Sequence, residues 1–438
     1  MTRTTFVGGI HPYEGKELSK DKPIQDILPQ GDMVYPLSQH IGAPAVPIVN
    51  KGDRVLAGQK IAEAGGFISA CICSSVSGIV KAIEPRRVVT GDMVMSIVIE
   101  NDHRYEEVEI IEPKALEELS REEIIGFIKE AGIVGMGGAG FPTHVKLSVE
   151  KPEKIDYVIV NCAECEPYLT SDYRRMVEEP DKILEGLKVS LALFPNAKGV
   201  LAIEDNKPDC IKLFKEMTVD EPRILVRKLK TKYPQGAERS LIYAVTKRKL
   251  DSSKLPADVG CVVNNADTIV AIYQAVIHRK PLMERIVTIT GDAIVDPKNF
   301  RVKIGTNYHE LIEAAGGFKK EPEKIISGGP MMGFGIFELD LPTTKTASAL
   351  VCLTKDEVSL LEPTACINCG RCLEVCPARL MPNKLASFSE RHKEDEFLNY
   401  YGMECVECGC CSYVCPAKRY LAQNIKSMRK TMLGKKKK

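Results

Sequence analysis

The chain has 438 residues, of which 44% are hydrophobic and 27% are charged, which is ordinary for a soluble globular protein. This length is too great for one compact core and predicts two to four domains. Because 60 basic residues are balanced by 59 acidic ones, the net charge of +1 excludes a general attraction to nucleic acid, so we expect no nucleic-acid partner.

The N-terminal residues and the lengths of the apolar runs indicate the cellular location of the chain. No run approaches the ~18 apolar residues of a membrane-spanning helix. The N-terminus lacks the apolar stretch of a signal peptide. We therefore expect a cytoplasmic chain whose membrane role, if it has one, is peripheral. The cytoplasm keeps thiols reduced, so sixteen cysteines predict metal binding rather than disulfides.

Residues 1–110 are predicted to form a small β module. Between Pro44 and Glu84, short alternating runs are separated by glycine turns, as in a β-barrel or sandwich. These runs resemble the two halves of a lipoyl/biotinyl hammerhead. The expected hairpin tip reads GGFISACICSS and has no lysine, so we expect the shape without the carrier chemistry. Cys71 and Cys73 lie at this tip, where packing is the preferred role and metal ligation the alternative.

Residues 111–282 alternate between helical and apolar strand-like stretches, which predicts an α/β layer with a largely parallel sheet. Its first predicted helix has Ser120 followed by Glu123, the spacing of a capping box. Residues 283–342 predict a β-rich module with one helix. After Pro342 the composition shifts toward cysteine and helix formers, which marks a last domain over 343–425.

The last domain contains two runs with the spacing C-x2-C-x2-C-x3-C-P, CINCGRCLEVCP and CVECGCCSYVCP. Three closely spaced thiolates hold three corners of an iron–sulfur cubane, and the fourth cysteine typically serves the other cluster. Structural zinc is the disfavoured alternative, because zinc sites do not need the third cysteine or the trailing Cys-Pro. Cys410 is expected to be a buried spare. The helix-forming interval between the runs predicts an all-helical two-cluster ferredoxin. The predicted ligand sets are Cys366, Cys369, Cys372 with Cys415, and Cys405, Cys408, Cys411 with Cys376.

Clusters carry one electron at a time, whereas a nicotinamide carries a hydride, so a chain that joins the two needs a cofactor such as flavin. The stretch GIVGMGGAGFPTHVK follows a predicted helix and has glycines at 135, 137, 138 and 140. Such a loop lets backbone N–H groups approach a phosphate closely. Taken alone, the loop is equally consistent with a structural turn.

Four motifs in order resemble the NADH-binding subunit of respiratory complex I. GMGGAGFPTHVK is similar to GRGGAGFPTGLK, with Met136 in place of the arginine; NCAECEP, YPQGAERSL and VNNADT are similar to NADESEP, YICGEETAL and VNNVET. The resemblance implies non-covalent FMN, with NAD(H) as substrate. It places the flavin and its phosphate against Gly135, Gly137, Gly138, Ala139, Gly140 and Lys146, and the flavin's polar edge and tail against Asn161, Asn264, Asn265 and Thr268. It directs a catalytic set toward the nicotinamide: Glu164, Glu166, Glu238 and Phe141.

The order of modules resembles, from end to end, the C subunits of Rnf complexes, with a hammerhead, a Rossmann-like flavin domain, a β-grasp module and a two-cluster ferredoxin. That resemblance implies a peripheral subunit on the cytoplasmic face of the bacterial cell membrane. It would pass electrons between NAD(H), FMN and two 4Fe–4S clusters in a complex that moves Na⁺ or H⁺. The implied partners are the iron–sulfur B subunit, the integral membrane subunits and, indirectly, ferredoxin. The alternatives are a soluble flavin and iron–sulfur reductase, such as a microcompartment cobalamin reductase, and a flavin-free electron-transfer scaffold.

The end of the chain, residues 426–438, is predicted to be a basic tail. It ends in four lysines, from Lys435 to Lys438. A solvated, frayed end is the preferred interpretation, and contact with anionic lipid or an acidic partner is the alternative.

Overall fold

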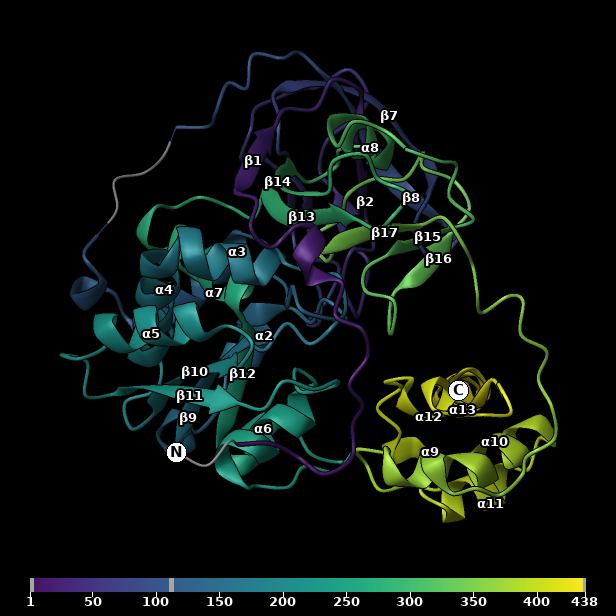
Figure 1. Ribbon diagram of the computed structural model, residues 1–438. Helices are drawn as coiled ribbons and strands as arrows, with labels where there is room; N and C mark the ends of the chain where they lie inside the picture. Colours follow the sequence, from purple (N-terminus) through teal and green to yellow (C-terminus); the bar gives the residue numbers. More distant parts are fainter. Residues whose placement is uncertain (1–3, 110–113, 436–438) are drawn as a thin grey trace.

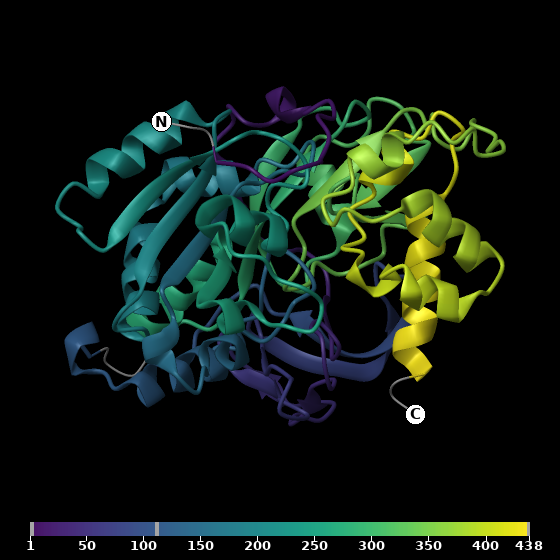
Figure 2. The ribbon, with the colours of Figure 1, turned by 90° about the horizontal axis from the view of Figure 1, so that it is seen from below.

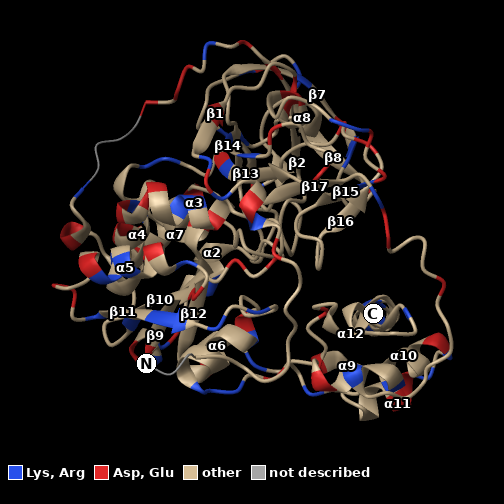
Figure 3. Ribbon diagram, in the orientation of Figure 1, with Lys and Arg blue, Asp and Glu red and all other residues tan. Residues whose placement is uncertain are grey.

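The computed structural model describes residues 4–109 and 114–435 of the chain. They form a barrel-sandwich module, an α/β domain, a domain built on a six-stranded sheet, and a C-terminal helical domain (Figure 1). In the view from below, the α/β domain and the C-terminal helices lie on opposite flanks of the molecule (Figure 2). Acidic and basic residues are intermixed over all these parts, in keeping with the near-neutral net charge (Figure 3). None of the helices in the described ranges combines the length and the apolar character needed to cross a membrane.

The barrel-sandwich module consists of two small sheets whose strands pair antiparallel. Side chains such as Tyr35, Ile61 and Ile97 are fully buried between them, because alternate residues of each strand point inward. One sheet has the order β2 (Met33–Pro36), β8 (Met93–Asn101), β7 (Gly78–Arg87), β4 (Arg54–Val55). The other has the order β3 (Val46–Pro47), β5 (Lys60–Glu63), β6 (Ile72–Cys73). Cys71 and Cys73 are buried in this module.

The α/β domain is a parallel four-stranded sheet of order β11 (Ile224–Leu229), β10 (Lys198–Glu204), β9 (Tyr157–Cys162), β12 (Cys261–Asn265). These strands are apolar runs because helices cover both faces. On one face pack α4 (Pro180–Ala192), α5 (Pro208–Met217) and α7 (Ala266–Ile277), and on the other α6 (Glu238–Thr246) (Figure 1). The remaining helices are α1 (Arg121–Glu130), α2 (Thr143–Leu147) and α3 (Ser171–Glu178). The capping box of Ser120 and Glu123 is confirmed at the start of α1.

The six-stranded sheet recruits strands from beyond the predicted 283–342 boundaries. Its order is β1 (Ile24–Ile27), β14 (Lys298–Lys303), β13 (Glu284–Thr290), β17 (Ala349–Leu353), β15 (Lys324–Ser327), β16 (Phe334–Ile336), with α8 (Tyr308–Ala314) beside it. The apolar run of β17 fills the gap between β13 and β15 and pairs with both of them. The sheet therefore extends past residue 342, because β13 and β15 each need a hydrogen-bonding partner on that side.

The C-terminal domain is helical, as the interval between the cysteine runs predicts. Its helices are α9 (Arg371–Glu374), α10 (Pro382–Glu390), α11 (Glu394–Asn399), α12 (Cys410–Tyr413) and α13 (Leu421–Lys435). The prediction that residues 426–438 form a solvated tail is wrong for residues 426–435, which continue α13. Ile425, Met428 and Met432 recur at helical spacing and are buried in the domain core, so this segment is packed. The last three lysines of the predicted tail lie outside the described residues.

An N-terminal strap, residues 4–20, leads into β1 of the six-stranded sheet and runs between two other domains. In Figure 1 this purple segment passes between the teal α/β domain and the yellow helical domain. Thr4 and Ile10 form bridges with Leu229 and Tyr233 of the α/β domain. Gly9 N donates to Val375 O of the helical domain at 2.8 Å. The two sheets of the predicted module 1–110 therefore begin only at β2, after the strap and β1.

Candidate functional site

The glycine-rich stretch forms a tight loop between α1 and α2. Gly135 N donates to Phe141 O at 2.9 Å, which closes the loop at its base. Met136 N donates to Thr268 Oγ1 at 3.0 Å and so attaches the loop to the first turn of α7. Gly140 has a φ of +70°, and a β-carbon built there would lie 3.0 Å from Thr346. The loop geometry therefore requires glycine at position 140.

The outer part of this loop presents bare backbone to solvent. Gly137, Gly138 and Ala139 are all exposed. A β-carbon at Gly138 would have no heavy atom within 4 Å, whereas one at Gly137 would lie 2.9 Å from Asn265. The space in front of Gly138 is thus open, while Gly137 packs closely against the start of α7. Such a surface allows a planar or anionic ligand to approach the backbone.

Asn161 and Asn265 lie side by side because β9 and β12 are adjacent parallel strands with these two residues in register, and Asn265 also packs against Gly137 of the loop. Asn161 Nδ2 donates to Gly236 O at 2.8 Å, and Asn265 caps α7 by accepting from Asp267 N. Asn264 is 2% exposed, and neither atom of its side-chain amide has a hydrogen-bond partner. A buried amide without partners is rare and fits a site that completes its hydrogen bonds with a polar ligand.

Lys146 adds a positive charge to the site formed by the glycine loop and the asparagines of β9 and β12. Its Nζ donates to Val263 O at 2.8 Å and lies 3.8 Å from Glu238 Oε1, at the start of α6. Burial lowers the pKa of this lysine, although the nearby Glu238 carboxylate counters the effect. The structure thus brings together the open glycine loop, the unpartnered amide of Asn264 and one lysine. This set fits the polar edge and the phosphate of FMN.

The four residues predicted to face the nicotinamide are divided between two places. Phe141 lies at the base of the glycine loop, and Glu238 lies beside Lys146. Glu164 is linked to that region through Asp172, whose N–H donates to Glu164 Oε1 at 2.7 Å. Glu166 instead accepts from Met331 N at 3.1 Å, in the loop between β15 and β16, and burial raises its pKa to about 7.

Lys16 of the strap is a site residue that no motif indicated. Its Nζ lies 3.6 Å from Glu164 Oε2 and donates to Glu166 O at 3.1 Å. The strap therefore covers the acidic segment after β9 and neutralises part of its charge. The sequence gives no signal for this contact, because Glu164 lies 148 positions after Lys16 along the chain.

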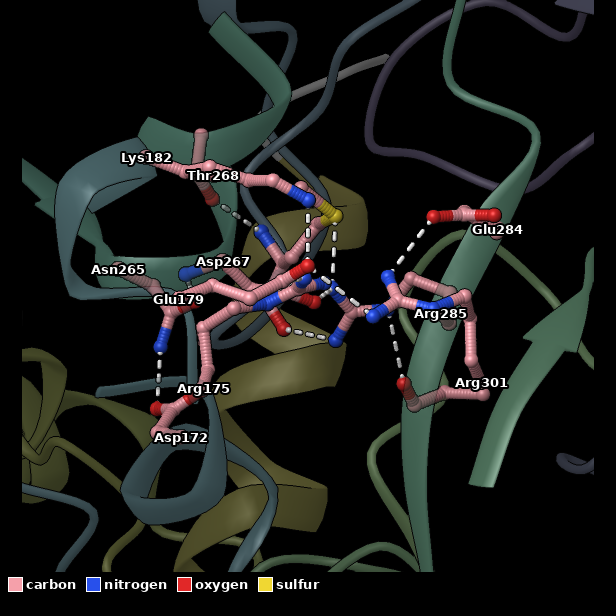
Figure 4. A network of polar contacts seen from close by, with 12 residues as sticks. Asp172, Arg175, Glu179, Lys182, Asn265, Asp267, Thr268, Glu284, Arg285 and Arg301 are labelled. Carbon is pink, nitrogen blue, oxygen red and sulfur yellow. Dashed lines mark hydrogen bonds and ion pairs between the residues drawn. The ribbon is translucent and has the colours of Figure 1, made fainter. Parts of the chain in front are cut away.

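Asp172 is expected to make stability depend on pH. It accepts from Asn265 Nδ2 at 2.6 Å (Figure 4), and burial, with the nearby Glu164 and Asp267, raises its pKa from 3.8 to about 7. Between these values the unfolded chain releases the proton and the folded chain keeps it, so rising pH favours unfolding. As pH rises from 5 to 7, we expect the free energy of unfolding of Asp172→Asn to increase relative to that of the wild type by about 1–2 kcal/mol.

Unfolding midpoints of both proteins from pH 5 to 8 measure this difference. Asp267→Asn is the control with the opposite sign. Burial opposes ionisation of Asp267, but Arg175 and Arg285 outweigh it and lower the pKa of this carboxyl. Its replacement should therefore cost stability throughout this pH range. A difference between wild type and Asp172→Asn that does not change with pH contradicts the prediction.

The eight predicted cysteine ligands line two separate cavities in the C-terminal domain, with the crossed arrangement that the spacing predicts. The first cysteine set surrounds one cavity: Cys366, Cys369, Cys372 and Cys415. The second cysteine set surrounds the other: Cys376, Cys405, Cys408 and Cys411. Within residues 4–109 and 114–435, no three His, Cys, Asp or Glu side chains converge to hold a single metal ion. Thiols placed around a cavity fit a multi-iron cluster held at its corners.

The two cysteine runs fold in the same way. Asn368 and Gly370 of the first run have positive φ angles of 55° and 79°, and Glu407 and Gly409 of the second run have 56° and 78°. A short helix follows each glycine, α9 in one case and α12 in the other. Equal spacing thus gives equal backbone turns.

The two sets differ in their surroundings. Cys366 and Cys369 of the first set are exposed to solvent. The second set instead lies against the α/β domain, where Cys408 packs in one apolar cluster with Tyr233 and Cys165. Cys410 is fully buried in the same cluster, as expected for a spare cysteine, and its Sγ lies 3.9 Å from Tyr233 O. The second cavity is therefore the one nearer to the α/β domain.

Four family models match the chain, each to a different part. They are described as RnfC Barrel sandwich hybrid domain (residues 4–104), Nuo51 FMN-binding domain (128–274), SLBB domain (286–335) and 4Fe-4S dicluster domain (365–418). These matches confirm the prediction of a multidomain α/β chain that binds FMN and iron–sulfur clusters.

Curated relatives match almost the whole chain. A protein of Acetobacterium woodii, named as the C subunit of a Na⁺-translocating ferredoxin:NAD⁺ oxidoreductase complex, is 43% identical over 99% of this chain and 98% of its own length. Its proton-translocating counterpart from Clostridium ljungdahlii is 46% identical over 91% of this chain and 87% of its own. The C subunit of the ion-translocating oxidoreductase complex of Vibrio cholerae is 37% identical over 89% of this chain and 51% of its own.

Solved structures share the fold at low sequence identity. An NAD⁺-reducing nickel–iron hydrogenase in its H₂-reduced state matches with a TM-score of 0.51 and 15% identity, over 74% of this chain and 63% of its own. The sequence identity of 43% and 46% to the first two relatives, over 99% and 91% of the chain, carries more weight than this likeness of fold. The chain belongs to the family of C subunits of ion-translocating ferredoxin:NAD⁺ oxidoreductase (Rnf) complexes.

Proposed function

We propose that this chain is the peripheral subunit of such a complex that passes electrons between NAD(H), FMN and two 4Fe–4S clusters. The observation that carries the proposal is the position of the second cysteine set, which packs directly against the α/β domain that contains the glycine loop. The near full-length relatives are named as subunits of complexes with this activity. A soluble microcompartment reductase and a flavin-free scaffold are disfavoured by the same matches.

FMN, when bound, exchanges hydride with nicotinamide and single electrons with clusters. In the proposal, Gly137, Gly138 and Ala139 present their backbone to the flavin. Lys146 faces the flavin's phosphate, and Asn161 and Asn264 hold the flavin's polar edge. Asn265 and Thr268 fix the start of α7, while Gly135 and Gly140 keep the loop closed. This assignment is supported by the unpartnered amide of Asn264 and the open space before Gly138.

The side facing the nicotinamide is proposed to include Phe141 and Glu238, which lie next to the glycine loop, and Glu164, which is linked to Asn265 through Asp172. Glu166 is proposed to border the path toward the second cysteine set, because its carboxylate contacts the β15–β16 loop that packs there. Its role then concerns electron passage more than nicotinamide binding.

The surroundings of the two cysteine sets support a direction for the path. The second set lies against the α/β domain, and the first set has two exposed cysteines. We therefore propose that electrons from the flavin reach the second cluster first, cross to the first cluster, and leave there to a partner. The reverse reaction would use the same path.

The partners and the finer domain assignments complete the proposal. The partners would be the iron–sulfur B subunit and the integral membrane subunits, with ferredoxin served indirectly and Na⁺ or H⁺ as the translocated ion. The chain would lie on the cytoplasmic face of the bacterial membrane. The α/β domain is proposed to be Rossmann-like, the six-stranded sheet domain a β-grasp module, and the barrel-sandwich module a hammerhead without carrier chemistry.

An anaerobic pull-down tests the proposed assembly. A tagged chain recovered from gently solubilised membranes is expected to bring down integral membrane proteins and an iron–sulfur protein. The same tag on an unrelated cytoplasmic flavoprotein is the control. Recovery of the chain alone, from the soluble fraction and with active flavin, would instead favour the soluble reductase.

A further inference from the structure

A buried arginine from outside the α/β domain reaches the glycine loop. Arg285 is the second residue of β13, in the six-stranded sheet domain, and is 3% exposed. Its Nη2 donates to Met136 O at 3.3 Å, and its Nη1 lies 2.7 Å from Met136 Sδ. Because Met136 N is held by Thr268, both backbone polar groups of this loop residue have partners. The loop is therefore fastened at its middle from two domains.

The guanidinium of Arg285 is itself fixed by further bonds. Its Nε donates to Ala347 O at 3.0 Å, and its Nη1 pairs with Asp267 in the first turn of α7 (Figure 4). Asp267 is shared with Arg175, whose Nη2 lies 2.7 Å from its Oδ1. A fork that makes several bonds in one plane is the geometry that arginine provides and lysine does not. The position of the charge over the loop is thus well determined.

The segment next to Ala347 supports the ends of the same loop region. Lys345 is 1% exposed, and its Nζ donates to Gly132 O at 2.7 Å, just before the loop. Thr346 packs against Gly140, since a β-carbon at position 140 would lie 3.0 Å from the Thr346 side chain. The six-stranded sheet domain therefore contacts the loop region at its start, middle and end.

We propose that Arg285 is a positioning residue for FMN binding, and that it holds the glycine loop in its binding conformation before the flavin arrives. The loop carries Met136 where the similar motif of the complex I subunit has arginine. In this chain the guanidinium that contacts this loop residue comes from another domain. The inference rests on the proposed flavin site, and it adds that the six-stranded sheet domain is part of that site's support.

Replacement of Arg285 by lysine tests the proposal in the full-length chain. Lysine keeps the charge beside Asp267 but cannot bond to Asp267, Met136 and Ala347 together. Loss of charge-assisted hydrogen bonds to the loop is expected to weaken FMN binding about ten- to a hundredfold. The measurement is FMN titration of flavin-stripped protein by fluorescence, with iron content and unfolding midpoint measured in parallel.

Arg301→Lys is the matched control, because Arg301 lies on the neighbouring strand β14 and is also ion-paired. Its partners are Asp26, Glu179 and Glu284, so its replacement leaves the loop contacts in place. Weaker FMN binding in Arg285→Lys alone, with unchanged iron and unfolding midpoint, supports the proposal. Equal FMN affinity in the wild type and Arg285→Lys overturns it, as does equal weakening in both variants.

Hydrogen exchange on the wild type gives a second test that does not depend on how a variant folds. If the loop is held in its binding conformation before the flavin arrives, the Met136 amide, which donates to Thr268, stays protected from exchange after FMN is stripped. Fast exchange of this amide in the stripped but folded protein overturns the proposal. A wild-type chain that binds no FMN at all would instead refute the proposed flavin site, so the two failures are distinguishable.

Discussion

Removing two thiols of the second cysteine set, by Cys405→Ala together with Cys408→Ala, is expected to stop NADH from reducing the cluster that remains. The remaining cluster should still be reduced by dithionite. The physical reason is position, because the second set packs against the α/β domain, whereas two cysteines of the first set are exposed to solvent. Electron paramagnetic resonance after anaerobic addition of NADH measures the fraction of the remaining cluster that is reduced.

The matched variant removes the corresponding thiols of the first set, Cys366→Ala with Cys369→Ala. Here NADH is expected to reduce the remaining second cluster to the wild-type extent, while transfer to an external acceptor is lost. FMN and iron contents of both double variants establish that the rest of the chain is loaded. Reduction by NADH of the first cluster alone, but not of the second alone, would reverse the proposed order.

Replacing Gly138 by phenylalanine is expected to weaken FMN binding and leave the iron in place. A β-carbon at Gly138 meets open space, so a large side chain would occupy the space before the loop without disturbing the protein core. Filling a site in this way costs about 1–3 kcal/mol, so FMN binding should weaken about ten- to a hundredfold. Flavin absorbance and iron content of the purified protein measure both cofactors.

Gly138→Ala is the control for this change. Its methyl group has no heavy atom within 4 Å, and Gly138 is not among the positive-φ glycines, so alanine is accepted there without strain. FMN affinity near the wild-type value is expected for alanine. If phenylalanine leaves the FMN content unchanged, the flavin does not lie before this part of the loop. Loss of iron together with FMN would contradict the separation of the two cofactor sites.

The parts of the fold that could be predicted are those encoded by local sequence. The spacing of the two cysteine runs sets the backbone turns at Asn368 and Glu407, and the crossed grouping of the cysteines follows from it. The alternation of helical and apolar strand-like stretches over residues 111–282 predicts the parallel sheet of the α/β domain. For these features the pattern within a short segment carries the necessary information.

The parts that could not be predicted depend on contacts between distant segments. Lys16 reaches Glu164, and Arg285 reaches Met136, without any motif that links them. β17 joins the six-stranded sheet because β13 and β15 need a partner, which is a property of the assembled sheet. The lysines at the end of the chain predict a solvated tail, although the spacing of the buried methionines before them indicates α13.

The most direct test of the account is whether NADH reduces the iron–sulfur clusters only through bound flavin. Anaerobic wild-type protein, once loaded with FMN and once stripped of it, should be mixed with NADH and followed by electron paramagnetic resonance. The account predicts reduced clusters in the loaded protein and none in the stripped one, with both forms reducible by dithionite. Equal reduction by NADH in the two forms, or a chain loaded with flavin and iron whose clusters never accept electrons from NADH, would contradict it.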